Sequence, residues 1–357
     1  MCLLRLSFAQ SKSLLAIAVN ASTLSVVELS FKKKHYHLLA YGMVALEEGE
    51  VVDNQIIDTE HMGQRIATLV ARSSCQTKQA AMALATDMVI TRHINLPNDL
   101  DEQDIEAQIR VDADQYIPYP LNEVSLDFEV FGAAKDEVGC NEVLLIVART
   151  EYVDQYRDTL IFAGLKPKVI EVEAQATERA LQLMVSANIN YLGTTALVDI
   201  GQSRTTIYIA QQGQFVYQLQ QLFGDSHLTS AIVAHYGLVS EEAERAKLDP
   251  KSLIDYDQLL FQPFIDTLMT HLTVALEQYA ATEISGEIEQ VILCGRGSVL
   301  PQLDCKLQHQ LSLPVTLANP FKAMNISATI DTEQLLKDAP QLMTACGLGM
   351  RCQRVGY

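Results

Sequence analysis

Apolar and polar positions follow the same pattern in two distant segments of the chain. Segment 15–29 reads LAIAVNASTLSVVEL and segment 196–210 reads ALVDIGQSRTTIYIA. In each, β-branched and other apolar residues flank a few small polar residues, which is typical of two strands joined by a tight turn. Aligned position by position, the copies match Ile17 with Val198, Val19 with Ile200, Ser22 with Ser203 and Val26 with Ile207. A further turn and strand follow each copy, so the pattern predicts an internal duplication with three strands in each half.

A different pattern lies between the two copies. Asp101 is expected to cap a helix over 101–117, whose acidic residues stand opposite an apolar stripe. Ile117-Pro118 should end this helix, since the residue before proline avoids helical geometry. Strands over 124–131 and 143–148 and a helix capped by Thr150 and ended by Gly164 are predicted next. The alternation of helices and strands predicts an α/β insertion over 83–168.

Helices dominate the pattern after the second copy. They are expected at 226–236, from Ser240, and over 254–282, where Pro263 should kink or split the helix. A buried strand at 290–293 then leads into a glycine-containing loop, and the last helix is predicted at 339–352.

Composition narrows the function classes. The chain has 357 residues, 48% of them hydrophobic, which is enough for more than one domain. The net charge of -18 would repel a phosphate backbone, so nucleic acid is not an expected partner. Seven cysteines without a CxxC pair indicate reduced thiols rather than a disulfide scaffold or zinc site. No apolar run approaches the ~18–20 residues of a membrane span, and the chain is interpreted as cytoplasmic.

Three local motifs could carry chemistry. Asp199-Ile200-Gly201 places a carboxylate at a strand end before a glycine turn, which suits Mg²⁺ and phosphate but also occurs as a plain turn. The loop Gly295-Arg296-Gly297-Ser298 would let a flat ligand approach, or simply join a strand to a helix. Glu244 and Lys247, three residues apart on one helix face, could hold a ribose or pair with each other.

The order of these features resembles the ATPase fold shared by actin, the heat-shock chaperone ATPases and FtsA. Within that fold the chain resembles the PilM family of type IV pilus assembly proteins. The motifs that carry this resemblance are DADQYIPYPLNEVSLDFEVFG at 112–132, LIVARTEYVDQYRDTLIFAGLKPKVIEVEAQATERA at 145–180, TALVDIGQSRTTIYI at 195–209, ILCGRGSVLPQL at 292–303, LPVTLANPF at 313–321 and APQLMTACGLGMR at 339–351.

The resemblance implies an α/β protein of two duplicated actin-like lobes. The first lobe would comprise 1–82 and 169–192 with the insertion 83–168, the second 193–338, and 339–357 would form a C-terminal helix packing back on the first lobe. It also implies a site for ATP or ADP with Mg²⁺, with Asp199 organising the metal. The implied nucleotide-binding residues are Asp199, Gly201, Gln202, Ser203, Glu244, Lys247, Gly295, Gly297, Ser298, Asn20 and Ser22.

Several residues depart from the family pattern. The first hairpin typically carries Asp, Gly and a later Lys, where this chain has Ala18, Asn20 and Ser25. Since phosphoryl transfer depends on positioning and charge neutralisation, hydrolysis is not expected. Arg296 replaces a glycine of the adenosine loop, and it could crowd the base, stack on it or point to solvent.

The resemblance implies a scaffold rather than a working enzyme. Such a scaffold would be cytoplasmic, held at the inner membrane by the N-terminal tail of a PilN-like protein, and connected to the pilus motor platform that serves twitching motility. Whether the chain forms a homodimer is left open by the sequence. The residues expected to contact the tail are Ile105, Ile109, Tyr116 and Ile117. The alternatives are an active actin-like ATPase, a cell-division protein of the FtsA type, or a cytoplasmic component of a type II secretion system.

Overall fold

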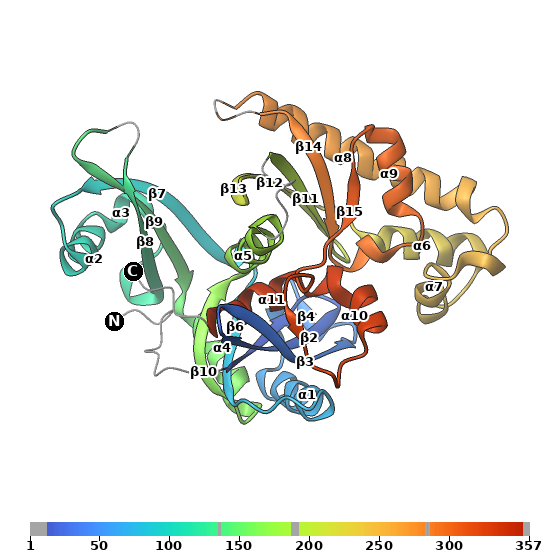
Figure 1. The fold of residues 1–357 in the computed structure, drawn as a ribbon, viewed down its shortest axis with the longest axis horizontal. Helices are drawn as coiled ribbons and strands as arrows, with labels where there is room; N and C mark the ends of the chain where they lie inside the picture. Colours follow the sequence, from blue (N-terminus) through green and yellow to red (C-terminus); the bar gives the residue numbers. More distant parts are fainter. Residues whose placement is uncertain (1–12, 135–136, 187–192, 283, 285, 353–357) are drawn as a thin grey trace. The chain divides into compact units, whose positions relative to one another are not determined.

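The computed structural model describes residues 13–134, 137–186, 193–282, 284 and 286–352 (Figure 1). The chain divides into two compact units, which are described separately. The first comprises residues 1–34, 39–176 and 348–357, and the second comprises 35–38 and 177–347. Each unit contains a mixed β-sheet with helices packed against it, so the α/β class predicted from the sequence is confirmed.

The sheet of the first unit begins with the first predicted hairpin. Strand β1 pairs antiparallel with β2, with Ile17 opposite Val26, and parallel with β6 on its other side. The strand order is β10-β6-β1-β2-β3. The bounds are β1 Ser13–Val19, β2 Thr23–Lys32, β3 His35–Ala45, β6 Gln79–Leu84 and β10 Lys166–Val172. The short strand β16 (Asn325–Ile326), in the second unit, pairs with His37 and Leu38 at the start of β3.

Two helices complete the core of the first unit. Helix α1 (Thr59–Arg72) is capped at its N-terminus by Asp58, whose side chain accepts a hydrogen bond from the His61 backbone N–H. Helix α4 (Thr150–Phe162) packs against α1, and its Val153 and Tyr156 belong to the same apolar cluster as the strands. Helix α4 is therefore part of the lobe, and the insertion ends before it.

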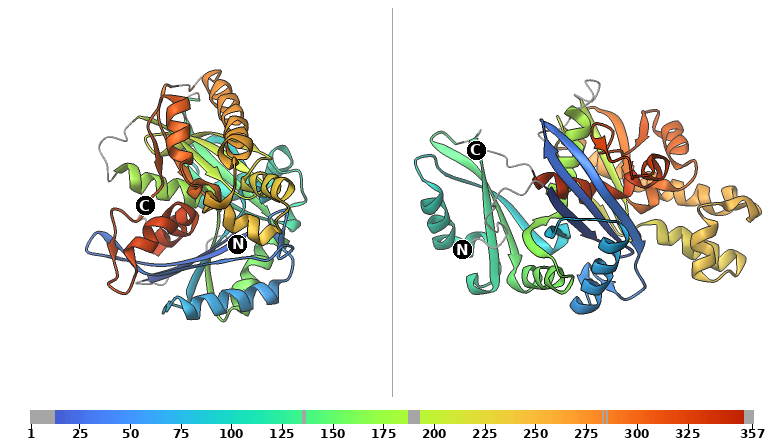
Figure 2. Two further views of the ribbon diagram at one scale, coloured as in Figure 1. Left: turned by 90° about the vertical axis from the view of Figure 1, so that its right-hand side faces the viewer. Right: turned by 60° about the horizontal axis from the view of Figure 1, so that its bottom comes forward.

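The insertion is a three-stranded sheet covered by two helices, with an apolar cluster of its own (Figures 1 and 2). Its strand order is β7-β9-β8. The bounds are β7 Val89–Pro97, α2 Glu102–Val111, α3 Ala113–Tyr116, β8 Val124–Ala133 and β9 Cys140–Arg149. Asp101 caps α2 as predicted, and the predicted single helix is interrupted at Asp112.

The bounds of the insertion differ from the predicted 83–168. Residues 83–84 end strand β6, and residues 150–168 contain α4 and the start of β10, all in the lobe. Thr150 does not cap α4: it is the first helical residue, and its hydroxyl lies 3.3 Å from that of Ser125. Gly164 follows the helix with φ +70°, which glycine adopts readily, so the predicted end is confirmed.

The sheet of the second unit repeats the order of the first. Strand β11 pairs antiparallel with β12 and parallel with β14, and the order is β13-β12-β11-β14-β15. The bounds are β11 Thr194–Ile200, β12 Thr205–Gln211, β13 Gln214–Gln221, β14 Ile288–Cys294 and β15 Val315–Leu317. The corresponding order in the first unit is β3-β2-β1-β6-β10, so the predicted duplication is confirmed at the level of topology.

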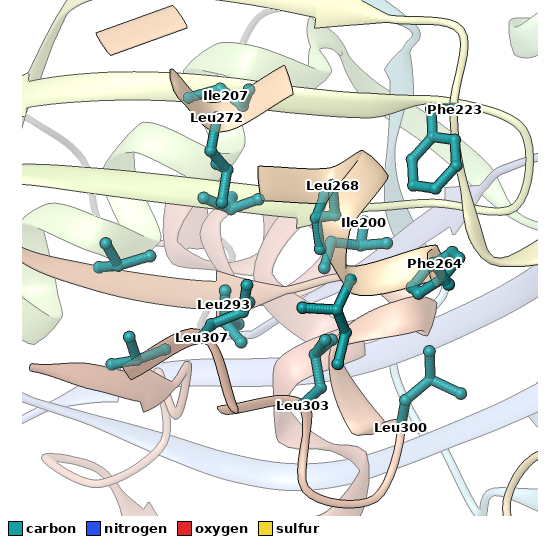
Figure 3. Packing of buried hydrophobic residues seen from close by; sticks show 14 of the residues in the cluster. Ile200, Ile207, Phe223, Phe264, Leu268, Leu272, Leu293, Leu300, Leu303 and Leu307 are labelled. Atoms are coloured by element: carbon teal, nitrogen blue, oxygen red, sulfur yellow. The ribbon is translucent and has the colours of Figure 1, made fainter. Parts of the chain in front are cut away.

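Helices pack on the second sheet through apolar side chains (Figure 3). Helix α8 (Gln262–Ala280) places Phe264, Leu268 and Leu272 against residues of β11, β12 and β14. With the π-helical turn Asp257–Phe261 before it, this helix has 24 residues and contains an 18-residue window with a mean hydropathy of 1.3, so by length and composition it could span a membrane. Its buried stripe shows that it is a core helix of this lobe. Pro263 lies in the first turn of α8, just after the π-helical turn. The sequence predicted a kink or split at this proline, and the regular α-helix begins there.

Helices α6 (Asp225–Tyr236) and α7 (Ser240–Ala246) follow the second hairpin, and Gly237 ends α6 in the left-handed conformation. The predicted last helix is α11 (Met343–Gly349) with 3₁₀ turns on either side. Residues 339–347 belong to the second unit, and the 3₁₀ turn Met350–Cys352 at the end of this segment contacts β1 and β2 of the first unit. The remaining elements are β4 Val51–Val52, β5 Gln55–Ile56, α5 Glu173–Ser186, α9 Leu303–Leu311 and α10 Thr332–Asp338.

Candidate functional site

The carboxyl ends of β11 and β14 bring two predicted motifs together. These parallel strands place Asp199 opposite Cys294, so the Asp199-Gly201 turn and the loop from Gly295 leave the same edge of the sheet. Ligands of open α/β sheets bind at this edge. Gly295 has φ +79°, and a Cβ there would overlap the Asp199 carboxylate. Only glycine fits this position, because the side chain of Asp199 lies directly against it.

The Asp199 side chain makes no hydrogen bond or ion pair within the part of the chain that the structure describes. Burial raises the pKa of its carboxyl group from 3.8 to about 6. A carboxylate held in this way is destabilised when charged, and a cation beside it would relieve that cost. The geometry fits the predicted role of Asp199 in organising a metal ion.

The turn of the second hairpin is fixed by its own backbone and by helix α6. The Gly201 N–H donates to the Arg204 carbonyl at 2.8 Å, and the Gly201 and Gln202 carbonyls accept from the N–H groups of Asp225 and Ser226. Among the described residues, the N–H groups of Gln202 and Ser203 have no acceptor. Successive free N–H groups in a turn suit phosphate oxygens.

The first hairpin, in the other unit, satisfies its own N–H groups. The Asn20 side-chain oxygen accepts from the N–H groups of Ser22 at 3.1 Å and Thr23 at 2.8 Å. The Asn20 N–H in turn donates to the Thr23 carbonyl. Asparagine closes turns in this way because its side chain reaches the backbone two residues on. The N–H groups of Asn20, Ser22 and Thr23 are therefore occupied by the hairpin itself and are not available to a phosphate.

Glu244 and Lys247 belong to a buried polar cluster rather than to an exposed ion pair. The Lys247 ammonium lies 2.7 Å from Oδ2 of Asp225, 2.9 Å from Oγ1 of Thr229 and 2.9 Å from the nearer carboxylate oxygen of Glu244. The Lys247 side chain is 2% exposed. Burial lowers the pKa of Lys247, and Asp225 opposes that shift. Helices α6 and α7 are joined by this cluster.

Arg296 extends the cluster from the loop after β14. Its Nε lies 3.2 Å from Oδ2 of Asp225, and its terminal nitrogen donates to Glu244. Arg296 therefore turns toward the two acids and does not point freely to solvent. Its side chain is 22% exposed and that of Glu244 is 29% exposed, so the pair lies at the rim of the cluster.

The other residues of this loop are used in packing. The Ser298 hydroxyl donates to the Gly295 carbonyl at 2.7 Å, and Ser298 is 1% exposed. A Cβ on Gly297 would overlap the side chain of Ile200. These contacts explain the residue types without a ligand.

The site thus fits one half of a nucleotide. Asp199 and the N–H groups of Gln202 and Ser203 are free to meet phosphate and its metal ion. On the nucleoside side, the polar atoms of Glu244 and Lys247 already have partners. Within the described residues, no group of three or more His, Cys, Asp or Glu side chains is arranged to hold a metal ion by itself.

The residues expected to contact a partner lie mostly in the interior of the insertion. Ile105, Ile109 and Ile117 are at most 5% exposed and pack in its apolar cluster, against which Tyr116 also packs. Because buried side chains cannot offer a surface, we assign the three isoleucines to packing and exclude them from the docking surface.

Asp225 and Thr229 were missed by the sequence reasoning. Both are buried and both contact Lys247. The available signal was their spacing of four residues at the start of a helix, which puts a carboxylate and a hydroxyl on one face.

Two lobes with the same strand order, hairpins at corresponding positions and an insertion in the first lobe define a protein of the actin-like ATPase fold. The sequence profile described as "Type IV pilus assembly protein PilM" matches residues 16–353. The chain therefore belongs to the PilM family of type IV pilus assembly proteins.

Solved structures show the same fold. A chain of the "PilM-PilN type IV pilus biogenesis complex" superposes with a TM-score of 0.81 at 24% identity, over 96% of this chain and 99% of that chain. The ethanolamine utilization protein EutJ from Carboxydothermus hydrogenoformans superposes with a TM-score of 0.58 at 14% identity, over 97% of this chain and 92% of that chain.

Proposed function

We propose that this chain is a cytoplasmic scaffold of the type IV pilus inner-membrane platform, and that it binds the cytoplasmic N-terminal tail of a PilN-like membrane protein. The observation that carries the proposal is the family match over residues 16–353. The likeness to a chain from a PilM–PilN complex supports the choice of partner. The tail would hold the scaffold at the inner membrane, where it would meet the pilus motor platform.

The second lobe, in this proposal, binds ATP or ADP weakly as a structural ligand. The free Asp199 carboxylate and the free N–H groups of Gln202 and Ser203 support a phosphate-facing role for this hairpin. A Mg²⁺ ion bound with the nucleotide would neutralise phosphate charge. Asp199 would orient the water shell of that ion.

Hydrolysis is negligible in this proposal because the first hairpin lacks the groups it would need. Asn20 occupies two N–H groups of its own turn, and Ala18 offers no carboxylate. Loss of even one positioned donor typically costs ~10²–10³ in rate.

The docking surface for the tail is placed on the insertion, where helix α2 carries exposed carboxylates. Glu102 and Asp104 are exposed, whereas Asp101 caps the helix and Glu106 pairs with Arg110. An acidic surface favours a tail that carries Lys or Arg. Extended peptides bind mainly through backbone pairing and a few apolar pockets, so these charges would tune rather than create the affinity.

The test is titration of a fluorescent peptide, the complete cytoplasmic tail of the PilN-like protein, against the full chain and against a chain in which residues 90–147 are replaced by a Gly-Ser linker. This replacement keeps α4, whose Tyr156 and Leu160 belong to the lobe core. We expect binding to the full chain and none to the shortened chain. Full-strength binding by a shortened chain with a native circular dichroism spectrum would show that the tail binds the lobes and not the insertion. No binding to the full chain would overturn the proposal.

A further inference from the structure

Four charged side chains of the second lobe neutralise one another: Asp225, Glu244, Lys247 and Arg296. Asp225 and Glu244 lie on different helices, α6 and α7, and Lys247 reaches both from just after α7. With Lys247 alone the group would keep one excess negative charge. Arg296, from a loop of the sheet, removes that excess by bridging the two acids.

The bridge stands beside the ligand-binding edge of the sheet. Arg296 follows Gly295 directly, and Gly295 lies against the Asp199 carboxylate. Asp225 is only 1% exposed, and its Oδ1 atom has no hydrogen-bond partner among the described residues. Buried polar atoms are seldom left in this state, so the cluster has bonding capacity that the protein does not use.

The carboxylate of Glu244, by contrast, has no free position for a further hydrogen bond. Thr229 donates to Oε1 at 2.6 Å, Lys247 lies within 3.0 Å of both carboxylate oxygens, and Arg296 donates to Oε2. Arg296 is the most exposed of these three donors and the only one on a loop of the sheet. It is therefore the partner that can leave without moving helix α6 or α7.

We propose that Arg296 is an intramolecular plug, which occupies Glu244 and Asp225 and must be displaced before a nucleoside hydroxyl or base can reach them. This inference rests on the proposed nucleotide binding. Ligands that contact only the second hairpin are unaffected by the plug. Ligands with a nucleoside compete with a charge-assisted hydrogen bond and bind more weakly for that reason.

The test is calorimetric titration of Arg296→Ala and the unchanged chain with three probes: Mg·ADP, adenosine and Mg·tripolyphosphate. Removing a competing charge-assisted bond should tighten ADP and adenosine binding by about tenfold or more and leave tripolyphosphate unchanged. Arg296→Lys, which cannot bridge both acids in the same geometry, should give an intermediate gain. Arg157→Ala is the matched control, because it removes another arginine that pairs with two acids on one helix. It should leave the affinities for all three probes unchanged.

The outcomes separate the plug from the nucleotide site itself. If Mg·ADP binds the unchanged chain and is lost in Asp199→Ala, but Arg296→Ala gains nothing, the site stands and the plug is overturned. If no probe binds either protein, both proposals fall. A lower melting temperature of Arg296→Ala without any gain in affinity would show a structural ion pair only, and would also overturn the plug. Should Arg296→Ala not fold, Arg296→Lys and Arg296→Gln carry the same comparison.

Discussion

The Lys247 ammonium lies 2.7 Å from Oδ2 of Asp225, and the two side chains are 2% and 1% exposed. Two opposite charges removed from water in this way depend on each other, because each offsets most of the other's cost of desolvation. The pair therefore joins helix α6 to the segment after α7 more firmly than its single contact distance suggests.

Replacing Lys247 by Met should destabilise the chain by about 3–5 kcal/mol, since it removes the buried cation and leaves Asp225 and Glu244 to share one part-exposed cation, Arg296. Urea unfolding at neutral pH measures this loss. Lys251→Ala is the control, because Lys251 pairs with Asp249 at 3.2 Å while both are largely exposed. That exposed pair should contribute less than about 1 kcal/mol. Similar losses in the two variants would contradict the assigned role of burial.

Replacing Asp199 by Asn should stabilise the chain at neutral pH and not in acid. Burial raises the pKa of Asp199 from 3.8 to about 6, so the folded chain holds the proton more tightly than the unfolded chain does. The stability of the unchanged chain therefore falls as pH rises from about 4 to about 6, and the loss persists above that range. Two pKa units correspond to about 3 kcal/mol, so we expect a gain of this size at pH ~7.5 that vanishes below pH ~3. A gain of equal size at both pH values would refute this account.

Restoring the first hairpin should raise nucleotide turnover. In Ala18→Asp with Asn20→Gly, a carboxylate is added and the N–H groups of Ser22 and Thr23 lose their internal acceptor. Phosphate release from Mg·ATP should rise at least about tenfold above a negligible background. The same double change in an Asp199→Ala background is the control and should remain inactive. Robust turnover by the unchanged chain would contradict the premise that its own hydrolysis is negligible.

Neutralising two exposed acids of α2 should weaken tail binding modestly. Glu102→Gln with Asp104→Asn removes charge from the helix surface without touching the Asp101 cap or the Glu106–Arg110 pair. The dissociation constant of a basic tail peptide should rise a few-fold, about 1 kcal/mol or less, and its dependence on salt should flatten. Fluorescence anisotropy at two salt concentrations measures both effects. Glu333→Gln, on an exposed residue of α10, is the matched control.

Local patterns predicted the elements, and non-local packing decided their grouping. The hairpins, the Asp101 cap and the end of α6 at Gly237 depend on residues a few positions apart, and the structure confirms them. Helix α4 was placed in the insertion because its apolar face looks the same whichever core it meets. Its contacts with α1 and β6, both far from it in the sequence, assign it to the lobe.

The site was predicted in the same partial way. Asp199 and Gly295 were found from their strand-end positions, and the structure brings them into contact. The partners of Glu244 and Lys247 could not be found, because Asp225 and Arg296 lie about 20 and 50 residues away in the chain. Ile105 and Ile109 were expected to contact the partner's tail, yet the stripe they form packs against the insertion's own sheet.

The turn closed by Asn20 has a consequence for how the protein responds to its surroundings. A phosphate-binding turn with free N–H groups, like that of Gln202 and Ser203, has hydrogen bonds still to gain from a ligand. Here the side-chain amide of Asn20 provides the acceptor permanently, at 2.8–3.1 Å from two N–H groups. The closure of the first turn therefore does not depend on a ligand, because the hydrogen bonds that hold it are made within the hairpin itself.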